Sequence, residues 1–387
     1  MIPNHRFKLL VCLPFLTPVI GGGAFALLNQ LELLAAEGFE IAVVYFQERA
    51  KELIPTRFPS YCLVKHVGSP RYYLEYLGLI RGVATILRKF EPDLILCNSN
   101  QPFWVCLAAR ALARSKAKLV TGEQNDMTRI FADAQWGWLR AYLTRTLDPH
   151  ADCIIVPSPW VAKQLIHEYH IPQEKIVAIP NPIPLDRVLE LSQHPVEHDW
   201  FRRHTRPIIL GVGVLDYQKD HETFLRAFAR VRTSMEARCV LIGDGPLRAE
   251  LERMAIQLGI AQDVAFLGFE SNPYRFMARA DVFVLSSQYE VLGMVLPEAM
   301  ACGCPIVATQ CVGPEEVLRA PHGELLGLLA PVKDWKALGD AMLQVLRDPA
   351  LRETFARKGV VRAQDYSAPR IAKEYATVLR QLLVVSP

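Results

Sequence analysis

The sequence predicts an α/β fold made of two Rossmann-like, doubly wound domains that face each other across a cleft. Strand-like and helix-like segments alternate through most of the 387 residues. The strand-like runs are short and almost continuously apolar, which is typical of parallel strands covered by helices on both faces. The alternation stops at a polar segment near the middle of the chain and then begins again, so we expect two successive domains, each with its own core.

The first half begins with a strand-like run at 7–13, a glycine-containing loop and a helix-like stretch at 24–37. Pro14 interrupts the apolar start, which favours a first strand over a secretory signal. Further strand-like runs occur at 39–46, 61–67, 93–98, 117–122, 153–158 and 175–180, with amphipathic stretches at 72–90 and 102–114. We assign residues 1–185 to an N-terminal Rossmann-like domain.

Residues 186–206 are polar and contain Pro195, and we interpret them as the interdomain linker. A second alternating series follows and predicts a C-terminal Rossmann-like domain over residues 207–366. Its expected strands lie at 207–213, 239–243, 264–268 and 281–286, and its expected helices at 222–231, 247–258 and 332–346. A last helix-like segment covers about 367–387.

The composition excludes several classes of protein. With 51% hydrophobic and 21% charged residues, the chain is well packed rather than disordered, and no apolar run approaches the roughly 18 residues of a membrane span. The nine cysteines are scattered, which fits reduced thiols in a cytoplasmic protein. The net charge of +3, concentrated in the first half, is compatible with contact with an anionic membrane surface but too small to indicate nucleic-acid binding.

The stretch 286–309 carries the strongest signal for a site. It contains a polar loop after a buried strand and then a short helix that begins near Met294 and ends at Gly303. Glu290 lies in the loop and Glu298 in the early turns of the helix. Gly293 permits close backbone approach, so this turn could hold a phosphate beside two hydroxyl acceptors. Alternatively, both glutamates are ordinary solvated residues.

Two other loops of the second half also follow strands. Lys219 precedes a helix, where its ammonium could neutralise a diphosphate leaving group. Phe269 could offer its ring to a nucleobase. A lysine on a loop is usually solvated, however, and Phe269 could equally belong to the core.

In the first half, Gly22 and Gly23 precede a helix and could approach a phosphate or form a tight turn without a ligand. Glu123, Gln124 and Asn125 follow a strand and could bind an acceptor hydroxyl or merely form a loop. The segment 136–147 alternates aromatic and aliphatic residues with arginines. This pattern fits either a membrane interface or packing on the sheet.

Other chemistry is not indicated. The glycines at 21–23 lack the spacing of a dinucleotide fingerprint, and the chain has no Walker lysine loop, GxSxG elbow, HExxH helix or Asp-x-Asp metal pair. We therefore expect neither a metal nor a cofactor.

Taken together, YEVLGMVLPEAMACGCPIVAT, GVGVLDYQKDHETFLRAFARV, LIGDGPL, VAFLG and ADCIIVPS followed by IPNP resemble the retaining glycosyltransferases of family 4, which have the GT-B fold. The resemblance covers most of the chain and is strongest at about 207–318. It implies transfer of a sugar from a nucleotide donor, commonly a UDP-sugar, with retention at the anomeric carbon and without a metal. The implied acceptor is lipid-linked or a polysaccharide, at the inner face of the membrane.

The resemblance also implies roles for residues. Lys219 would bind the diphosphate, Glu290 the donor sugar and Glu298 the ribose. Backbone from Leu292 through Gly293 and Met294 to Val295 would contact the diphosphate and sugar, with Gly22 and Gly23 nearby. The C-terminal helix would pack on the first domain.

Two positions depart from the family pattern. Val214 stands where an arginine is usual, and Gln124 where a histidine often occurs. They motivate an alternative hypothesis, a catalytically impaired homologue that binds a nucleotide sugar or a partner protein. A sugar-nucleotide epimerase or a phosphorylase of the same fold is less favoured.

Overall fold

A computed structural model describes residues 6–16, 30–48, 57–64, 72–124, 126–133 and 136–384 of the chain. It contains two compact units, the first made of Met1–Pro182 with Ala368–Pro387 and the second of Ile183–Ser367. Each unit is built on one parallel sheet with helices around it. The predicted class, two Rossmann-like α/β domains, is therefore confirmed.

The sheet of the first unit has seven strands in the order β3-β2-β1-β4-β5-β6-β7. All neighbouring pairs are parallel. The strands are β1 (Phe7–Leu16), β2 (Phe39–Glu48), β3 (Ser60–Val64), β4 (Leu94–Cys97), β5 (Lys118–Gly122), β6 (Cys153–Val156) and β7 (Ile176–Ala178). The order reverses between β1 and β4, as in doubly wound sheets.

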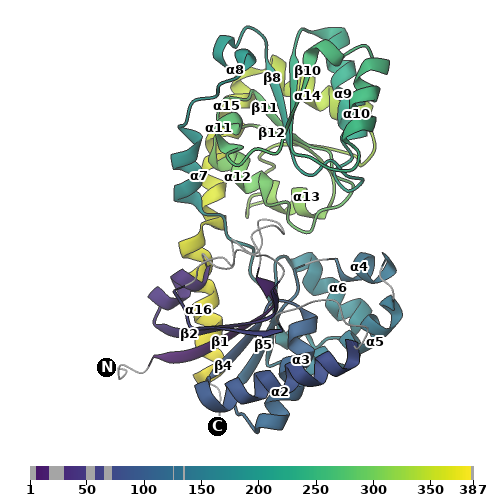
Figure 1. Cartoon of the computed structure of the whole chain (residues 1–387). Helices are drawn as coiled ribbons and strands as arrows, with labels where there is room; N and C mark the ends of the chain where they lie inside the picture. Colours follow the sequence, from purple (N-terminus) through teal and green to yellow (C-terminus); the bar gives the residue numbers. More distant parts are fainter. Residues whose placement is uncertain are drawn as a thin grey trace. The chain divides into compact units, whose positions relative to one another are not determined.

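Helices cover this sheet (Figure 1). They include α2 (Tyr72–Phe90), α3 (Asn100–Ala113), α4 (Met127–Asp133), α5 (Gly137–Leu147), α6 (Pro159–Tyr169) and α16 (Ala368–Val384). The C-terminal helix α16 belongs to this unit, because Ile371, Ala376 and Leu379 pack in one core with residues of β1 and β2. None of the helices in the described part of the chain is long and apolar enough to cross a membrane.

The sheet of the second unit has six parallel strands in the order β10-β9-β8-β11-β12-β13. They are β8 (Ile208–Val212), β9 (Arg238–Ile242), β10 (Val264–Gly268), β11 (Val282–Leu285), β12 (Ile306–Thr309) and β13 (Leu328–Ala330). Alternate residues serve two cores. Ile208 and Leu210 face one core, whereas Ile209 faces the other, so helices must cover both faces.

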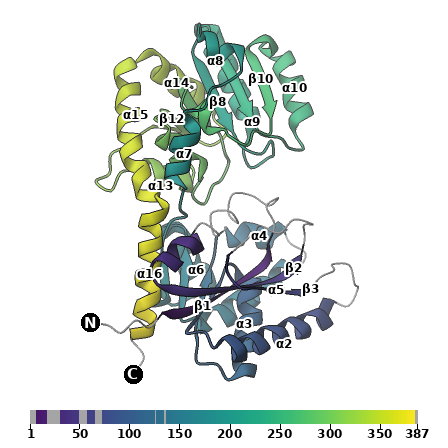
Figure 2. The same cartoon turned by 60° about the vertical axis from the view of Figure 1, so that its left-hand side comes forward.

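One face of the second sheet is covered mainly by α9 (His221–Ser234), α10 (Arg248–Gln257) and α14 (Trp335–Arg347). The other is covered by α7 (Leu185–Ser192), α8 (Asp199–Arg203), α11 (Tyr274–Met277), α12 (Val295–Ala301) and α13 (Val312–Leu318), and α15 (Pro349–Ala363) contributes to both cores (Figure 2).

The segment 186–206, predicted as a linker, differs from that expectation. It contains most of α7 and all of α8 and belongs to the second unit. Val188, Val196 and Phe201 are buried in its core. These three apolar residues are separated by many charged residues. The polar composition of the segment therefore concealed the amphipathic pattern of two helices.

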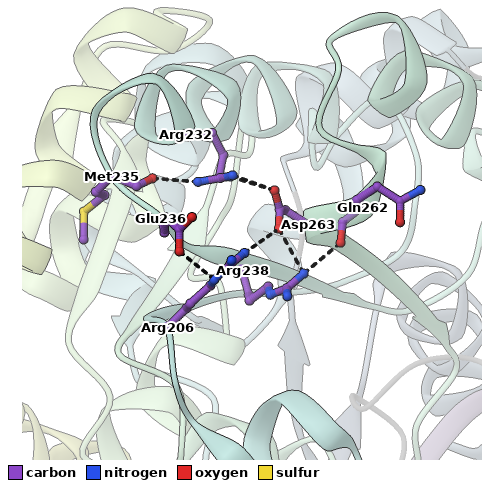
Figure 3. A network of polar contacts seen from close by, with 7 residues as sticks. All are labelled: Arg206, Arg232, Met235, Glu236, Arg238, Gln262 and Asp263. Atoms are coloured by element: carbon purple, nitrogen blue, oxygen red, sulfur yellow. Dashed lines mark hydrogen bonds and ion pairs between the residues drawn. The ribbon is translucent and has the colours of Figure 1, made fainter.

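A cluster of charges joins the amino ends of three strands in the second unit (Figure 3). The Asp263 carboxylate accepts hydrogen bonds from Arg206 at 3.3 Å, Arg232 at 2.8 Å and Arg238 at 2.9 Å. Arg206 also pairs with Glu236 at 2.9 Å. Because these arginines precede β8, end α9 and begin β9, the cluster ties separate elements together at this amino edge of the sheet.

Candidate active site

The order of the second sheet reverses between β8 and β11, which are neighbours although distant in sequence. Ligands of open α/β sheets bind outside the carboxyl ends of the strands at such a point, because the loops from the two strands diverge to opposite faces. The loops that follow β8 and β11 are therefore the first place to look. Lys219 and Glu290 lie in these two loops.

The loop after β8 is held in shape by its own polar groups. The Lys219 N–H donates to Asp216 Oδ1 at 3.0 Å. Asp220 begins α9 by accepting from the Thr223 N–H at 3.2 Å and the Thr223 hydroxyl at 2.9 Å. An aspartate cap fixes where a helix starts, so the backbone of Lys219, one residue before Asp220, is also held in place.

Lys219 and Glu290 meet across the two loops. The Lys219 ammonium forms an ion pair with Glu290 Oε1, and the two side chains are only 18% and 8% exposed. The same carboxylate oxygen accepts from the Ser287 hydroxyl at 2.8 Å. In such a partly buried place two charges attract each other more strongly than in bulk water, so the ion pair fixes both side chains.

Several further hydrogen bonds join the loops. The Gln288 N–H donates to Gln218 O at 2.8 Å, and Gln218 Nε2 donates to Tyr289 O at 3.2 Å. The Ser286 hydroxyl donates to Lys219 O at 2.7 Å. These bonds make the pair of loops one polar unit, which limits the motion of Lys219 relative to Glu290.

Glycines let the chain turn from Glu290 into α12. Gly293 has φ +74°, a left-handed conformation that other residues adopt at a cost. A Cβ on Gly313 would lie 2.9 Å from the Cβ of Glu290, so only glycine fits beneath that residue. Leu292 is buried, whereas Met294 and Val295 are partly buried. The backbone from Leu292 to Val295 thus follows Glu290 directly into the helix.

Glu298 lies on α12 in different surroundings. The Tyr274 hydroxyl donates to its Oε1 at 3.3 Å. Burial raises the pKa of Glu298 to about 7, because a charged carboxylate is costly away from water, while the Tyr274 hydrogen bond acts in the opposite sense. This glutamate therefore changes its charge close to neutral pH.

Two residues of the second unit project into solvent. The Phe269 side chain, which follows β10, is 83% exposed, so the alternative that it belongs to the core is wrong. Val214 is 52% exposed in the loop after β8. An exposed ring is available for stacking on a base, but its role remains a prediction.

The first-unit candidates lie in a separate polar cluster. Glu123 follows β5 and is buried, and its pKa is raised well above the usual range by burial and then by the charge of Asp148. Asp148 is also buried. It accepts from Trp104 Nε1 at 2.9 Å, and burial raises its pKa to about 7. Gln124 is partly buried beside Gly122. Gly22, Gly23 and Asn125 lie outside the described residues.

We searched the described residues for a metal site. No group of three His, Cys, Asp or Glu side chains there could hold a metal ion. Beside β8 and β11 the positive charge is the Lys219 ammonium, which is paired with Glu290.

Two partners in the site were missed from the sequence. Ser287 is buried and donates a hydrogen bond to Glu290. Its position in the polar loop directly after a strand is the sequence signal that could have identified it. Tyr274 reaches Glu298 from α11, 24 residues away. No spacing rule links a short helix to a later one, so that contact required the folded structure.

Two models of known protein families match the chain. A family model described as "Glycosyltransferase Family 4" matches residues 20–187, and a second, described as "Glycosyl transferases group 1", matches residues 196–361. The two matches lie one in each half of the chain, and the second includes Lys219, Glu290 and Glu298.

Similar proteins span nearly the whole chain. The N-acetylgalactosamine-N,N'-diacetylbacillosaminyl-diphospho-undecaprenol 4-alpha-N-acetylgalactosaminyltransferase of Campylobacter jejuni is 26% identical, over 93% of this chain and 96% of its own. The N-acetyl-alpha-D-glucosaminyl L-malate synthase of Bacillus anthracis is 25% identical, over 95% of each. The structure of Anabaena HepE with UDP and glucose aligns with a TM-score of 0.76 at 19% identity, covering 97% of this chain and 100% of its own.

Proposed function

Because this chain is a glycosyltransferase that belongs to family 4 and has the GT-B fold, we propose that it transfers a sugar, with retention, from a UDP-sugar to a lipid-linked or polysaccharide acceptor. One observation supports the donor side most strongly. Lys219 and Glu290, from the loops after β8 and β11, are paired at the point where the strand order reverses.

Each charge has a role in this proposal. The Lys219 ammonium binds the diphosphate and offsets the negative charge that grows on the leaving phosphate as the bond to the sugar breaks. Glu290 accepts hydrogen bonds from hydroxyls of the donor sugar, and Glu298 from the ribose. The ion pair with Glu290 orients Lys219 before the donor arrives, so its ammonium can contact phosphate oxygens with little reorganisation.

The acceptor side is supported by relatives. The Campylobacter protein is named for an undecaprenol-linked diphosphate acceptor, whereas the name of the Bacillus protein includes L-malate. The slightly basic first half of this chain suits an anionic acceptor at a membrane, so we favour the lipid-linked class.

A donor screen tests the proposal. The full chain is melted in the presence of UDP-, GDP- and ADP-sugars, and the release of sugar from each is measured with and without EDTA. We expect one nucleotide class to raise the melting temperature, because a ligand that binds only the native state stabilises it, and EDTA to leave the rate unchanged. Stabilisation by none of the nucleotide sugars would contradict the proposal.

The alternative, an impaired homologue that binds a nucleotide sugar or a partner protein, is motivated by Val214. Val214→Arg restores the cation that is usual in the family, and the variant is compared with Val214→Gln, which adds length without charge. A complete site gains little from the arginine. A gain in transfer of about 100-fold, typical of one cation at a leaving group, would instead show that the natural site is impaired.

A further inference from the structure

The first unit carries a group of large aromatic side chains in solvent. Trp136, Trp138 and Tyr142 are 61%, 69% and 61% exposed, although they lie within seven residues of one another. Trp136 directly precedes α5, and Trp138 and Tyr142 lie in this helix, which packs beside α4 and α6 (Figure 1). The sequence left open whether the aromatic residues of this segment pack on the sheet. Because these three rings are exposed, they do not.

The backbone holds the aromatic residues outward. Trp136 adopts a left-handed conformation with φ 65°, and a Cβ on Gly137 would lie 1.7 Å from Phe131 O. Gly137 thus lets the first turn of α5 press directly on the chain of α4. Thr144, on the same inward face, is buried and accepts from Asn100 at 3.2 Å. With those positions packed inside, the rings of Trp136 and Trp138 lie 6.4 Å apart outside.

An arginine accompanies the rings. Trp138, Tyr142 and Arg145 are spaced four and three residues apart, which places them along one side of the helix. Arg145 is exposed and donates to the main-chain oxygen of Glu168 at 2.8 Å, with no carboxylate partner among the described residues. Its charge is therefore not neutralised locally. Arg140, on the opposite flank, is also exposed.

This combination indicates the kind of partner. Indole and phenol rings with a polar edge favour the boundary between lipid headgroups and acyl chains, and an arginine beside them attracts anionic headgroups. Helix α5 has 11 residues and rises roughly 16 Å, about half of a bilayer core, so it can lie on a membrane but not span it.

We propose that Trp136, Trp138, Tyr142 and Arg145 form a membrane-docking surface that inserts its rings into the headgroup region of an anionic bilayer. This proposal depends on the proposed function only for the purpose of the surface, which is to bring the first unit to a lipid-linked acceptor. Its binding to lipid does not require sugar transfer, so the two proposals can fail separately.

The test is co-sedimentation of the full chain with vesicles of phosphatidylglycerol and phosphatidylcholine in equal parts, and of phosphatidylcholine alone. We expect binding to the anionic vesicles that weakens with salt. The double variant Trp138→Ser, Tyr142→Ser should bind them about tenfold or more weakly, because two rings no longer leave water. Arg145→Gln should bind more weakly and with less salt dependence.

Ile256→Ser is the matched control, since Ile256 is 68% exposed on α10 in the second unit. It should bind vesicles like the natural chain. Equal binding by the double variant, or no binding of the natural chain to anionic vesicles, would overturn the surface. So would a change from dimer to monomer in the double variant by light scattering, because the rings would then serve a second copy of the chain.

The same samples separate this proposal from the donor site. Melting with the nucleotide sugar found in the donor screen should show equal stabilisation of the double variant and the natural chain. Vesicle binding without donor stabilisation would contradict only the proposed function. Donor stabilisation without vesicle binding would contradict only the docking surface.

Discussion

The two edges of the second sheet use charge in opposite ways. At the amino edge, Asp263 receives hydrogen bonds from three arginines that belong to separate elements (Figure 3). At the carboxyl edge, Lys219 and Glu290 form one partly buried pair, and Glu298 sits where burial raises its pKa to about 7. A cluster that joins separate elements stabilises the fold, whereas a lone partly buried ion pair and a carboxyl with a raised pKa are typical of a functional site.

The largest effect should come from Lys219→Ala. We expect transfer to fall about 100- to 1,000-fold, because the cation at the leaving phosphate is lost, while the free protein loses less stability than Asp263→Ala does, because one ion pair rather than three is broken. Steady-state rates and thermal melts of the same sample measure both. Lys219→Arg, which keeps the charge, should retain part of the activity. A large loss of stability in Lys219→Ala would break the comparison, since the carboxyl edge would then be structural.

Asp263→Ala should have the reverse effect. Removing the carboxylate leaves three partly buried arginines facing one another, which should lower the free energy of unfolding by about 2–4 kcal/mol. Urea unfolding measures the change. Asp340→Ala, which breaks the more exposed pair with Arg230, is the control and should alter stability little. Reduced transfer by folded Asp263→Ala, with unchanged stability, would contradict the contrast between the edges.

The sequence indicated Lys219 and Glu290 better than it indicated the residues that hold the candidate site in shape. Lys219 and Glu290 follow apolar runs that had to be strands, and the carboxyl ends of parallel strands share an edge. Tyr274 could not be predicted beside Glu298, because that contact depends on how α11 packs on α12. Likewise, the polar segment 186–206 concealed α7 and α8, since three buried apolar residues among many charges do not show a clear period.

The first unit also holds a buried acid, Asp148, just before β6. Asp148, with an ordinary pKa of 3.8, has its pKa raised to about 7, so the folded state holds a proton that the unfolded state loses. This stabilisation is present below pH 3.8 and is lost as the pH rises through about 7. Asp148→Asn should make stability roughly 1–3 kcal/mol greater at pH 8 and flatten its pH dependence.

Asn can still accept from Trp104, so the substitution removes the charge and keeps the hydrogen bond. Unfolding followed from pH 5 to pH 8, with Asp152→Asn as the comparison, checks this expectation. Asp152 bridges Arg110 at 2.9 Å, so its loss should destabilise instead. Parallel pH profiles for the natural chain and Asp148→Asn would show that this carboxyl is not a protonated group in the fold.

The smallest effect concerns Glu298. Because its pKa is raised to about 7, donor affinity should increase as the pH rises through that value and the carboxylate becomes a stronger hydrogen-bond acceptor for the ribose. Glu298→Gln should bind the donor about tenfold more weakly at pH 8 and lose the pH dependence. Calorimetric titrations at pH 6 and pH 8 measure both, and an unaltered pH profile in Glu298→Gln would assign the titration to another group.

The central claim is that Lys219 binds the diphosphate and Glu290 the sugar at the carboxyl edge of the second sheet. Titration calorimetry with UDP and with a UDP-sugar, on the natural chain, Lys219→Ala and Glu290→Gln, tests it directly. We predict that Lys219→Ala weakens binding of both ligands, whereas Glu290→Gln, which removes the partner of Lys219 as well as the contact with the sugar, weakens binding of the UDP-sugar more than that of UDP. Equal affinities of all three proteins for both ligands would contradict the claim.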